Sequence, residues 1–304
     1  MFRKREVLRP IIANWDLYLM MLIPVIWYIM FAYAPMYGLQ IAFRDYLPSK
    51  GFWGSRWVGL MHFRRFFSSY YFTRILGNTL SINFYSLLAG FPIPIIFALI
   101  LNELKSQKFK KVVQNVTYLP HFLSTVVVVS IIQMLLQPNV GVVNALMRQF
   151  GLPTRDFLVE SGLFQHIYVW SGIWTNLGWD AIIYIAALSA VDLSLYEAAT
   201  IDGASRLQKM LYVSLPSISM TIVIMLILRC GNIMNIGYEK ILLMQNSLNM
   251  EKSDVISTFV YRGGILDADY SFSSAIGLFN SICNSLLLVA ANFIARRMGE
   301  ASLW

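Results

Sequence analysis

Polar side chains recur at helical spacing inside an apolar stretch in the middle of the chain. Asn176, Asp180 and Tyr184 are four residues apart, so on a helix they form one stripe. Trp174 and Trp179 flank this stripe, and their flat faces could stack against sugar rings. The amide and the carboxylate could bind a polar ligand through hydrogen bonds. They could equally join this helix to its neighbours, a role that asparagine often has in apolar surroundings.

A second polar stripe follows further along the chain. Arg229, Asn232 and Asn235 are three residues apart, so on a helix they would drift slowly around one face. Two amides at this spacing could reach one ligand, and Arg229 could add a charge-assisted hydrogen bond to an acidic group. Asn280 and Asn284 form a shorter pair, one helical turn apart. For that pair, packing between helices is the preferred interpretation.

Two opposite charges stand within these stripes, Asp180 in the first and Arg229 in the second. An unpaired charge in the middle of a membrane-spanning helix costs at least ~2.5 kcal/mol. We therefore predict that these two side chains neutralise each other across their helices.

The residue types of catalysis and metal binding do not gather in any recognisable motif. His62, His121 and His166 lack Cys or carboxylate neighbours at the spacing of metal ligands. The sequence contains no G-x-x-x-x-G-K-[ST] loop that could hold the phosphates of ATP. Cys230 and Cys283 lie in apolar runs and are interpreted as small apolar side chains rather than a disulfide. We expect that the chain is not an enzyme and has no metal site. If it takes part in transport that needs energy, another subunit must supply that energy.

Helices that cross a membrane must position these polar residues. The chain of 304 residues is 57% hydrophobic and only 13% charged, about half the charged share of a soluble domain. Apolar runs close to or above the ~20 residues that cross a bilayer as a helix recur along it. We predict one all-α, polytopic membrane domain over residues 1–304. Its six spans are expected at about residues 17–39, 76–101, 117–137, 166–190, 216–237 and 271–295.

The first span is predicted to be a retained anchor rather than a cleaved signal peptide. Basic residues within positions 3–9 precede an apolar run that reaches Ala32-Tyr33-Ala34, which resembles a cleavage site. Pro35 follows directly, and its fixed backbone angle fits an extended protease substrate poorly. The apolar run also continues to Phe43.

Six spans place both termini on one side of the membrane. Lys and Arg lie close to the span ends in the N-terminal tail and in the second loop, at Lys105, Lys108, Lys110 and Lys111. This bias predicts that both termini, and with them residues 194–216, are cytoplasmic. The formal net charge of +8 is attributed to loops that face anionic lipid, not to nucleic-acid binding.

Three segments are expected on the outer side. Residues 61–75 carry aromatic side chains on one helical face, which predicts a helix that lies in the membrane interface or leads into the second span. The loops 138–165 and 238–269 are long and are predicted to form irregular surface for an external partner.

The segment YEAATIDGASRLQKMLYVSLPS, residues 196–217, is polar although apolar runs precede and follow it. Ser194-Leu195-Tyr196-Glu197 and Ser205-Arg206-Leu207-Gln208 both match capping boxes, each of which begins a helix. Asp202-Gly203 ends the first helix, because Gly adopts the left-handed conformation readily. Pro216 lacks an amide hydrogen and is expected in the first turn of the next span. The sequence therefore predicts two short helices outside the membrane.

This segment resembles the EAA motif of ABC importer permeases. The match consists of Glu197-Ala198-Ala199, Gly203 after three further residues, and Leu215-Pro216. The stretches GYEKILLMQN, DVISTFVYRGGI, YSFSSAIGLFNS and ASLW are similar to the LplB branch of maltose-type sugar permeases. That branch serves polysaccharide-derived oligosaccharides, including aldouronate-type importers. The similarity covers nearly the whole chain and is weakest at the N-terminus.

The resemblance implies a type I ABC importer permease fold and the membrane subunit of an ATP-driven oligosaccharide importer. The expected partners are a second, homologous permease in a heterodimer, a dimeric ATPase that binds ATP and Mg²⁺, and an extracellular solute-binding lipoprotein. ATP-driven closure of the ATPase would open the sugar pathway to each side in turn. The expected location is the bacterial cytoplasmic membrane, with lipid as neighbour and no cofactor bound by this chain.

The resemblance also assigns roles to residues. In the family the Glu of the motif pairs with a basic residue of the ATPase, a role that maps to Glu197. The ATPase-coupling residues are expected to be Glu197, Ala198, Ala199, Asp202, Gly203, Leu215 and Pro216. Spans four and five carry sugar contacts in maltose-type permeases, and the two permeases can share these contacts unequally. The candidate substrate-binding residues are Trp174, Asn176, Trp179, Asp180, Tyr184, Arg229, Asn232 and Asn235.

Two other functions are compatible with a polytopic membrane protein. An ion-coupled secondary sugar transporter would need no capped helix pair of EAA pattern, and it often has inverted repeats, which are not evident here. A membrane scaffold or sensor subunit would leave the two polar stripes unexplained. The protein partners that co-purify with the chain would distinguish these functions.

Overall fold

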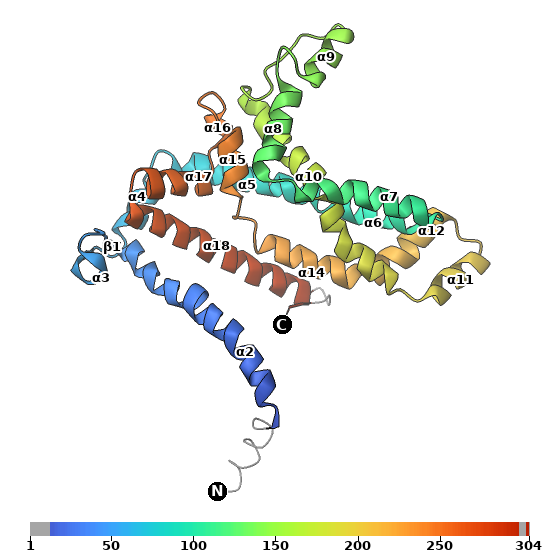
Figure 1. Ribbon diagram of the computed structural model, residues 1–304, viewed down its shortest axis with the longest axis horizontal. Helices are drawn as coiled ribbons and strands as arrows, with labels where there is room; N and C mark the ends of the chain where they lie inside the picture. Colours follow the sequence, from blue (N-terminus) through green and yellow to red (C-terminus); the bar gives the residue numbers. More distant parts are fainter. Residues whose placement is uncertain (1–12, 298–301, 304) are drawn as a thin grey trace.

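The computed structural model describes residues 13–297, 302 and 303, and nearly all of its regular structure is helical. Most helices run along the long axis of the molecule, and shorter elements lie at its two ends (Figure 1). The described strands form one antiparallel hairpin of β1 (Arg44–Asp45) and β2 (Arg56–Trp57). The predicted all-α fold class is confirmed. The basic residues at positions 3–9 lie outside the described part of the chain.

Six candidate spans emerge when bent helices are counted together. Three helical stretches are each long and apolar enough to cross a membrane, namely Trp15–Phe43, Phe72–Asn102 and Tyr270–Arg297. Three bent pairs pass the same test, namely Gln107–Phe122 with Thr125–Leu136, Ser161–Ser189 with Leu193–Ile201, and Arg206–Ser217 with Ser219–Cys230. The bends exceed 60° because Pro residues or capped turns interrupt the backbone hydrogen bonds.

The first stretch diverges from the other helices. It consists of α2 (Trp15–Tyr28), the π turn η1 (Ile29–Tyr33) and the 3-10 segment η2 (Ala34–Phe43). Segment η2 packs against α18 (Tyr270–Arg297), whereas α2 points away from the bundle with its apolar side chains exposed (Figure 1). The small helix α3 (Gly51–Gly54) lies in the loop of the hairpin.

The predicted interfacial helix over 61–75 is wrong in its extent. Helix α4 (Met61–Phe67) ends at Ser68, and α5 begins separately at Phe72. Phe66 is buried and meets the ring of Phe72 edge-to-face at 5.0 Å, while Tyr70 is exposed. Packing of Phe66 against the helical bundle therefore divides an aromatic set that the sequence pattern places on one face.

The second stretch consists of α5 (Phe72–Gly90) and α6 (Pro92–Asn102), which meet where Pro92 has no amide to donate. The following helices α7 (Gln107–Tyr118) and α8 (Thr125–Leu136) enclose an angle of 102° around the short η3 (Leu119–Phe122). The predicted third span, 117–137, is thus not one straight helix. Ser124 accepts a hydrogen bond from the Val127 amide at 3.3 Å and begins α8 anew.

The fifth predicted span, 216–237, differs most from the structure. Pro216 is the second residue of the short α13 (Leu215–Ser217), which continues from α12 (Arg206–Lys209) and η4 (Met210–Ser214) and ends before the next span begins. A bend of 63° follows, and α14 then extends only over Ser219–Cys230. Asn232 and Asn235 lie beyond this helix in a turn, so the predicted helical stripe is broken after its first residue.

The two long loops that are predicted to be outer hold short helices instead of irregular chain alone. The first contains α9 (Val142–Gln149), and the second contains α15 (Tyr238–Met244), α16 (Met250–Ser253), α17 (Ile256–Tyr261) and η5 (Arg262–Leu266). The buried carboxylate of Asp254 ties the second loop together, because it accepts a hydrogen bond from Arg262 at 2.6 Å and lies 3.6 Å from Arg74. Burial with two cations offsets the cost of removing Asp254 from water.

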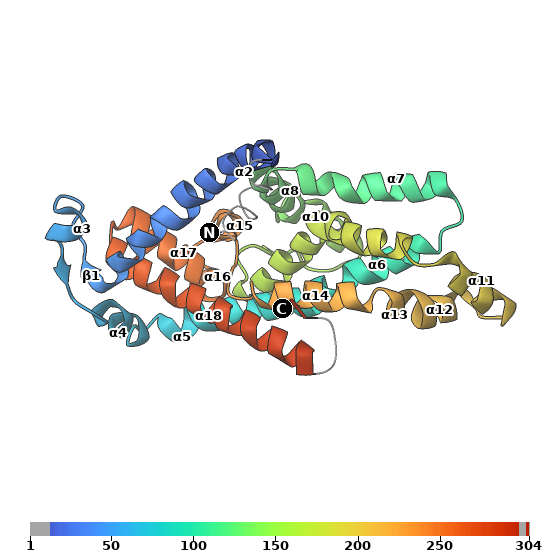
Figure 2. The ribbon, with the colours of Figure 1, turned by 90° about the horizontal axis from the view of Figure 1, so that it is seen from below.

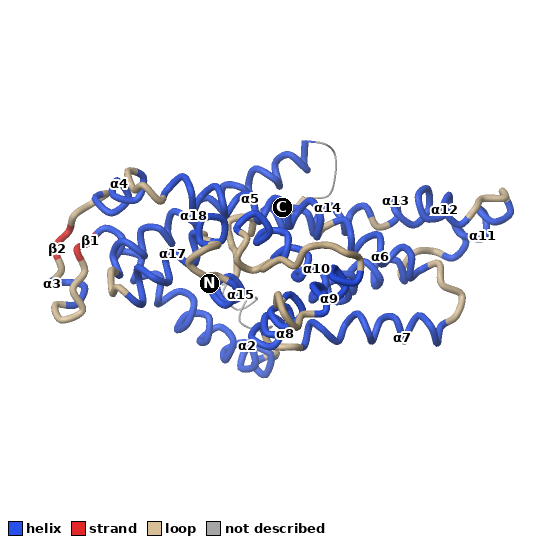
Figure 3. Tube along the Cα trace, turned by 90° about the horizontal axis from the view of Figure 1, so that it is seen from above, coloured by secondary structure: helices blue, strands red, loops and turns tan. Residues whose placement is uncertain are grey.

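Helix α10 (Ser161–Ser189) is the centre of the bundle. It packs against α5, α6, α7 and α14, and apolar clusters form along both of its ends. Gly178 permits the closest approach, since a Cβ there would lie 2.5 Å from the carbonyl oxygen of Thr117 on α7. Both cysteines are free, in agreement with the prediction. Figure 3 shows loops at both ends of the molecule and a longer stretch of loop near its middle.

Candidate substrate cavity and coupling loop

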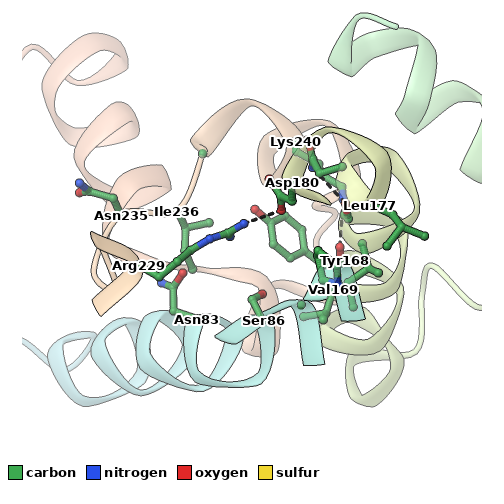
Figure 4. A pocket seen from close by; sticks show the side chains of 16 residues that line it. Asn83, Ser86, Tyr168, Val169, Leu177, Asp180, Arg229, Asn235, Ile236 and Lys240 are labelled. Atoms are coloured by element: carbon green, nitrogen blue, oxygen red, sulfur yellow. Dashed lines mark hydrogen bonds and ion pairs between the residues drawn. The ribbon is translucent and has the colours of Figure 1, made fainter. Parts of the chain in front are cut away.

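A cavity of about 250 Å³ lies between α5, α10, α14 and the chain that follows α14. Its polar lining comes from every one of these elements, so tertiary packing assembles it (Figure 4). Helix α5 contributes Asn83 and Ser86, and α10 contributes Asn176 and Asp180. The remaining polar lining residues are Tyr168, Arg229, Asn235 and Lys240.

An ion pair joins the two polar stripes across the cavity. Arg229 on α14 donates from Nη2 to Oδ2 of Asp180 on α10, as Figure 4 shows. The two side chains are 44% and 27% exposed in the isolated chain, so each retains some access to the cavity. The predicted pairing of these two residues is confirmed. Tyr184, one turn beyond Asp180, is buried in the apolar cluster with α6 and does not line the cavity.

The two tryptophans of the first stripe lie outside the cavity. Trp179 stacks on His121 with ring centroids 4.4 Å apart and planes 8° apart, so one of its faces is covered. His121 also bonds through Nδ1 to Oδ1 of Asn176 at 3.0 Å. Trp174 is half exposed and is not among the residues that line the cavity. The structure thus brings Asn176 and Asp180 to the cavity and leaves both indoles at its outside.

Asparagine side chains link the turn after α14 to α18. Nδ2 of Asn235 lies 3.4 Å from Oδ1 of Asn232, and Nδ2 of Asn280 donates to Oδ1 of Asn235 at 3.0 Å. Asn232 also donates to the carbonyl of Leu228 at 3.1 Å, which satisfies one unpaired carbonyl at the end of α14. Of these residues Asn235 lines the cavity, whereas Asn232 does not.

Asn284 has the packing role that its sequence context indicates. Its Oδ1 accepts a hydrogen bond from the backbone amide of Met234 at 2.9 Å, and both groups are buried. Gly231 sits opposite the same helix, and a Cβ there would lie 2.6 Å from Cδ1 of Leu288. This close approach holds the turn against α18 and so fixes where Asn235 stands.

Lys240 is a lining residue that sequence reasoning missed. Its Nζ donates to the carbonyl oxygen of Tyr168 at 2.9 Å and lies 4.6 Å from the centre of the Tyr168 ring. Burial lowers the pKa of Lys240 to about 8. The pattern of the sequence places Lys240 in an outer loop, because nothing in it indicates that the chain reverses after Cys230 and returns α15 to α10. A lysine directly after a polar stripe was the one available signal.

The segment between α10 and α14, the coupling loop of residues 194–216, lies at the end of the molecule opposite the β hairpin (Figure 2). Its first helix, α11 (Leu193–Ile201), begins differently from the prediction. Asp192 is the capping residue and accepts from the Ser194 amide at 2.9 Å, so the predicted capping box of Ser194 and Glu197 is wrong. The bonds from Ser194 lower the pKa of Asp192. Glu197 consequently points into solvent.

The second half of the coupling loop agrees with the prediction. Gly203 adopts φ +76° and ends α11, and Ser205 with Gln208 forms the predicted capping box at 3.3 and 2.7 Å. Tyr196 anchors the loop, since its hydroxyl lies 2.9 Å from Oγ of Ser214. Exposed apolar residues surround Glu197, and Ile201 is 86% exposed. An exposed apolar patch around one carboxylate is typical of a protein–protein contact.

Comparison with known proteins agrees with this architecture. The sequence profile of the binding-protein-dependent transport system inner membrane component matches residues 90–300. The chain belongs to this family. It is therefore a membrane-embedded transport subunit and not an enzyme, and its predicted relationship to ABC importer permeases is confirmed. Across residues 13–297, 302 and 303, no group of three His, Cys, Asp or Glu side chains is placed to hold a metal ion.

Relatives cover nearly the whole chain. The polygalacturonan/rhamnogalacturonan transport system permease protein YteP of Bacillus subtilis (strain 168) is 41% identical over 302 residues, which are 99% of this chain and 94% of YteP. Protein LplB of the same organism is 41% identical over 288 residues, 95% of this chain and 91% of LplB. The predicted similarity to the LplB branch is thereby confirmed.

A solved structure shares the fold. It is the crystal structure of a bacterial alginate ABC transporter in complex with an alginate pentasaccharide-bound periplasmic protein. One of its chains superposes with a TM-score of 0.89 at 39% identity, covering 97% of this chain and 99% of that one. The predicted type I ABC importer permease fold is confirmed by this likeness, and the secondary-transporter alternative is set aside.

Proposed function

We propose that this permease carries polysaccharide-derived oligosaccharides across the bacterial cytoplasmic membrane through the cavity between α5, α10 and α14. The observation that supports this most is the connection between cavity and coupling loop. Helix α10, with Asp180, leads into α11 through a bend of 74°, and the α12–α13 stretch leads into α14, with Arg229. A displacement of the loop therefore moves the two halves of the ion pair relative to each other.

The lining of the cavity suits a polyhydroxylated ligand. Amides on α5, on α10 and in the turn after α14 offer both donors and acceptors, and Ser86 adds a hydroxyl. Sugar hydroxyls have the same mixed character, so each can find a partner in either direction. YteP is a permease of a polygalacturonan and rhamnogalacturonan transport system, and the alginate transporter is involved in the import of an acidic polysaccharide, which supports the same substrate class for this chain.

The surfaces of the chain suit the partners of an ABC importer. Glu197 and the apolar side chains around it would dock on a dimeric ATPase, which binds ATP and Mg²⁺, and the short helices of 138–165 and 238–269 would face a sugar-loaded lipoprotein. The exposed apolar surface of α2 suits lipid or a homologous permease. Both termini and the coupling loop would then be cytoplasmic.

The assembly can be tested by purification and reconstitution. A complex isolated from membranes through a tag on this chain should contain an ATPase and a second permease. In proteoliposomes, the external binding protein loaded with oligosaccharide should stimulate ATP hydrolysis. A complex without an ATPase, or uptake driven by an ion gradient alone, would contradict the proposal.

The orientation in the membrane can be tested by cysteine labelling. Cys230 and Cys283 are replaced by Ala, and an impermeant thiol reagent should then label Lys252→Cys but not Ser205→Cys from outside.

A further inference from the structure

Lys240 is the positive charge of the cavity that lacks a negative partner. Two other charged residues line the cavity, and these, Asp180 and Arg229, neutralise each other. Among the residues that the structure describes, Lys240 forms no ion pair, and its recorded contacts are both with Tyr168. Asp180 lies on α10, Arg229 on α14 and Lys240 on α15 (Figure 4).

The Lys240 ammonium group is held in place but keeps hydrogen-bond donors that are available to a ligand. One of its three N–H bonds is directed to the carbonyl of Tyr168, and the ring of the same residue faces the charge at 4.6 Å. Tyr168 is itself fixed by stacking on Phe164, with ring centroids 6.2 Å apart. Two N–H bonds of Lys240 therefore have no acceptor among the described residues and remain for a ligand.

A desolvated ammonium group without a counter-ion is poorly stabilised. Burial removes water from Lys240, and a carbonyl dipole with an aromatic face replaces only part of the lost solvation. A carboxylate that enters the cavity would restore the missing charge and accept the two remaining N–H bonds. Such a bond between charged groups is about twice as strong as one between neutral groups.

We infer that Lys240 binds a sugar carboxylate in the cavity and so makes the permease select uronic-acid oligosaccharides over neutral ones. The inference rests on the proposed function, because it requires the oligosaccharide to pass through this cavity. It also reassigns a role: the sequence pattern suggests Arg229 for an acidic sugar, but Asp180 already neutralises the charge of that guanidinium. Lys240 is then the residue that determines the preference, and the amides contact hydroxyls.

The test uses the reconstituted complex and two substrates that differ only at their carboxyl groups. An oligogalacturonate is compared with the same oligosaccharide after chemical reduction of its carboxyl groups to primary alcohols. In the wild type, the KM for uptake of the acidic substrate should be lower. Lys240→Met should raise that KM about tenfold or more, because it removes a charge-assisted hydrogen bond, and should leave the KM of the neutral substrate nearly unchanged.

Two control variants separate specificity from structure. Lys240→Arg keeps the charge and should retain the preference, whereas Lys108→Met removes an exposed charge from α7 and should change neither KM. Equal losses for both substrates in Lys240→Met would show a structural role and overturn the inference. Equal KM values in the wild type would overturn it too, although transport itself would still support the proposed function. Transport of neither substrate would instead contradict the proposed function.

Discussion

The cavity and the coupling loop are both polar regions of an apolar chain, but their polar groups are satisfied in opposite ways. In the cavity, Asp180, Arg229 and Asn235 bond to side chains on other elements of the same chain. In the coupling loop, the caps at Asp192 and Ser205 are bonds within a few residues. The side chain of Glu197, in the first helix of that loop, forms no hydrogen bond or ion pair with the described residues.

This difference separates a site whose charges, except that of Lys240, are paired within the chain from a surface that is open to a partner. The cavity is arranged by packing of α10, α14 and α18, so it exists before a ligand arrives. The coupling loop has a locally determined shape and leaves one carboxylate with exposed apolar neighbours for another protein. Substitutions in both regions can test whether the cavity acts through bonds within the chain and the coupling loop through a partner protein.

The largest effect is expected in the coupling loop. Glu197→Lys should abolish the stimulation of ATP hydrolysis by sugar-loaded binding protein, because it places like charge against a basic residue of the ATPase. Since the Glu197 side chain has no hydrogen-bond or ion-pair partner among the described residues, the variant should still insert and bind the second permease. ATPase activity of the reconstituted complex is the measurement, and Lys108→Glu, an exposed charge reversal on α7, is the control. Normal stimulation in Glu197→Lys would show that the coupling loop does not act through this contact with the ATPase.

A smaller effect is expected when the ion pair of the cavity is broken. Asp180→Asn or Arg229→Met alone leaves one charge without a partner, at a cost of at least about 2.5 kcal/mol in a membrane interior. The double variant removes both charges and should assemble better than either single one. The yield of intact complex, measured by size-exclusion chromatography in detergent, gives the coupling. If the two losses simply add, the pair does not stabilise the cavity.

The smallest effect is expected for a single amide. Asn235→Ala should raise the KM for uptake a few-fold to about tenfold, because one neutral hydrogen bond to the sugar is lost. Basal ATP hydrolysis and assembly should stay normal. Asn284→Ala is the matched contrast, since it leaves the buried amide of Met234 unpaired and should reduce stability instead of affinity. Should Asn235→Ala also fail to assemble, its link to Asn280 is structural and the sugar contacts lie in the partner permease.

The local features of this protein were predictable from its sequence. The apolar runs, the left-handed turn at Gly203 and the capping box of Ser205 and Gln208 depend on residues that are close together in the chain. Even there, the predicted start of the first helix was displaced by two residues, because the N-cap is Asp192, whose carboxylate accepts a hydrogen bond from the Ser194 amide, and not Ser194. The family resemblance follows from the same local spacing.

Contacts between distant segments decided the rest. The sequence by itself placed Asp180 and Arg229 on two apolar helices and required a partner for each charge. Only tertiary packing could show that α14 ends at Cys230, that Trp179 is covered by His121, and that Lys240 returns to α10. Helical periodicity describes one segment at a time, whereas a cavity wall depends on which residues of different helices come close. In this chain Gly178 and Gly231 permit that approach, and no periodic pattern records it.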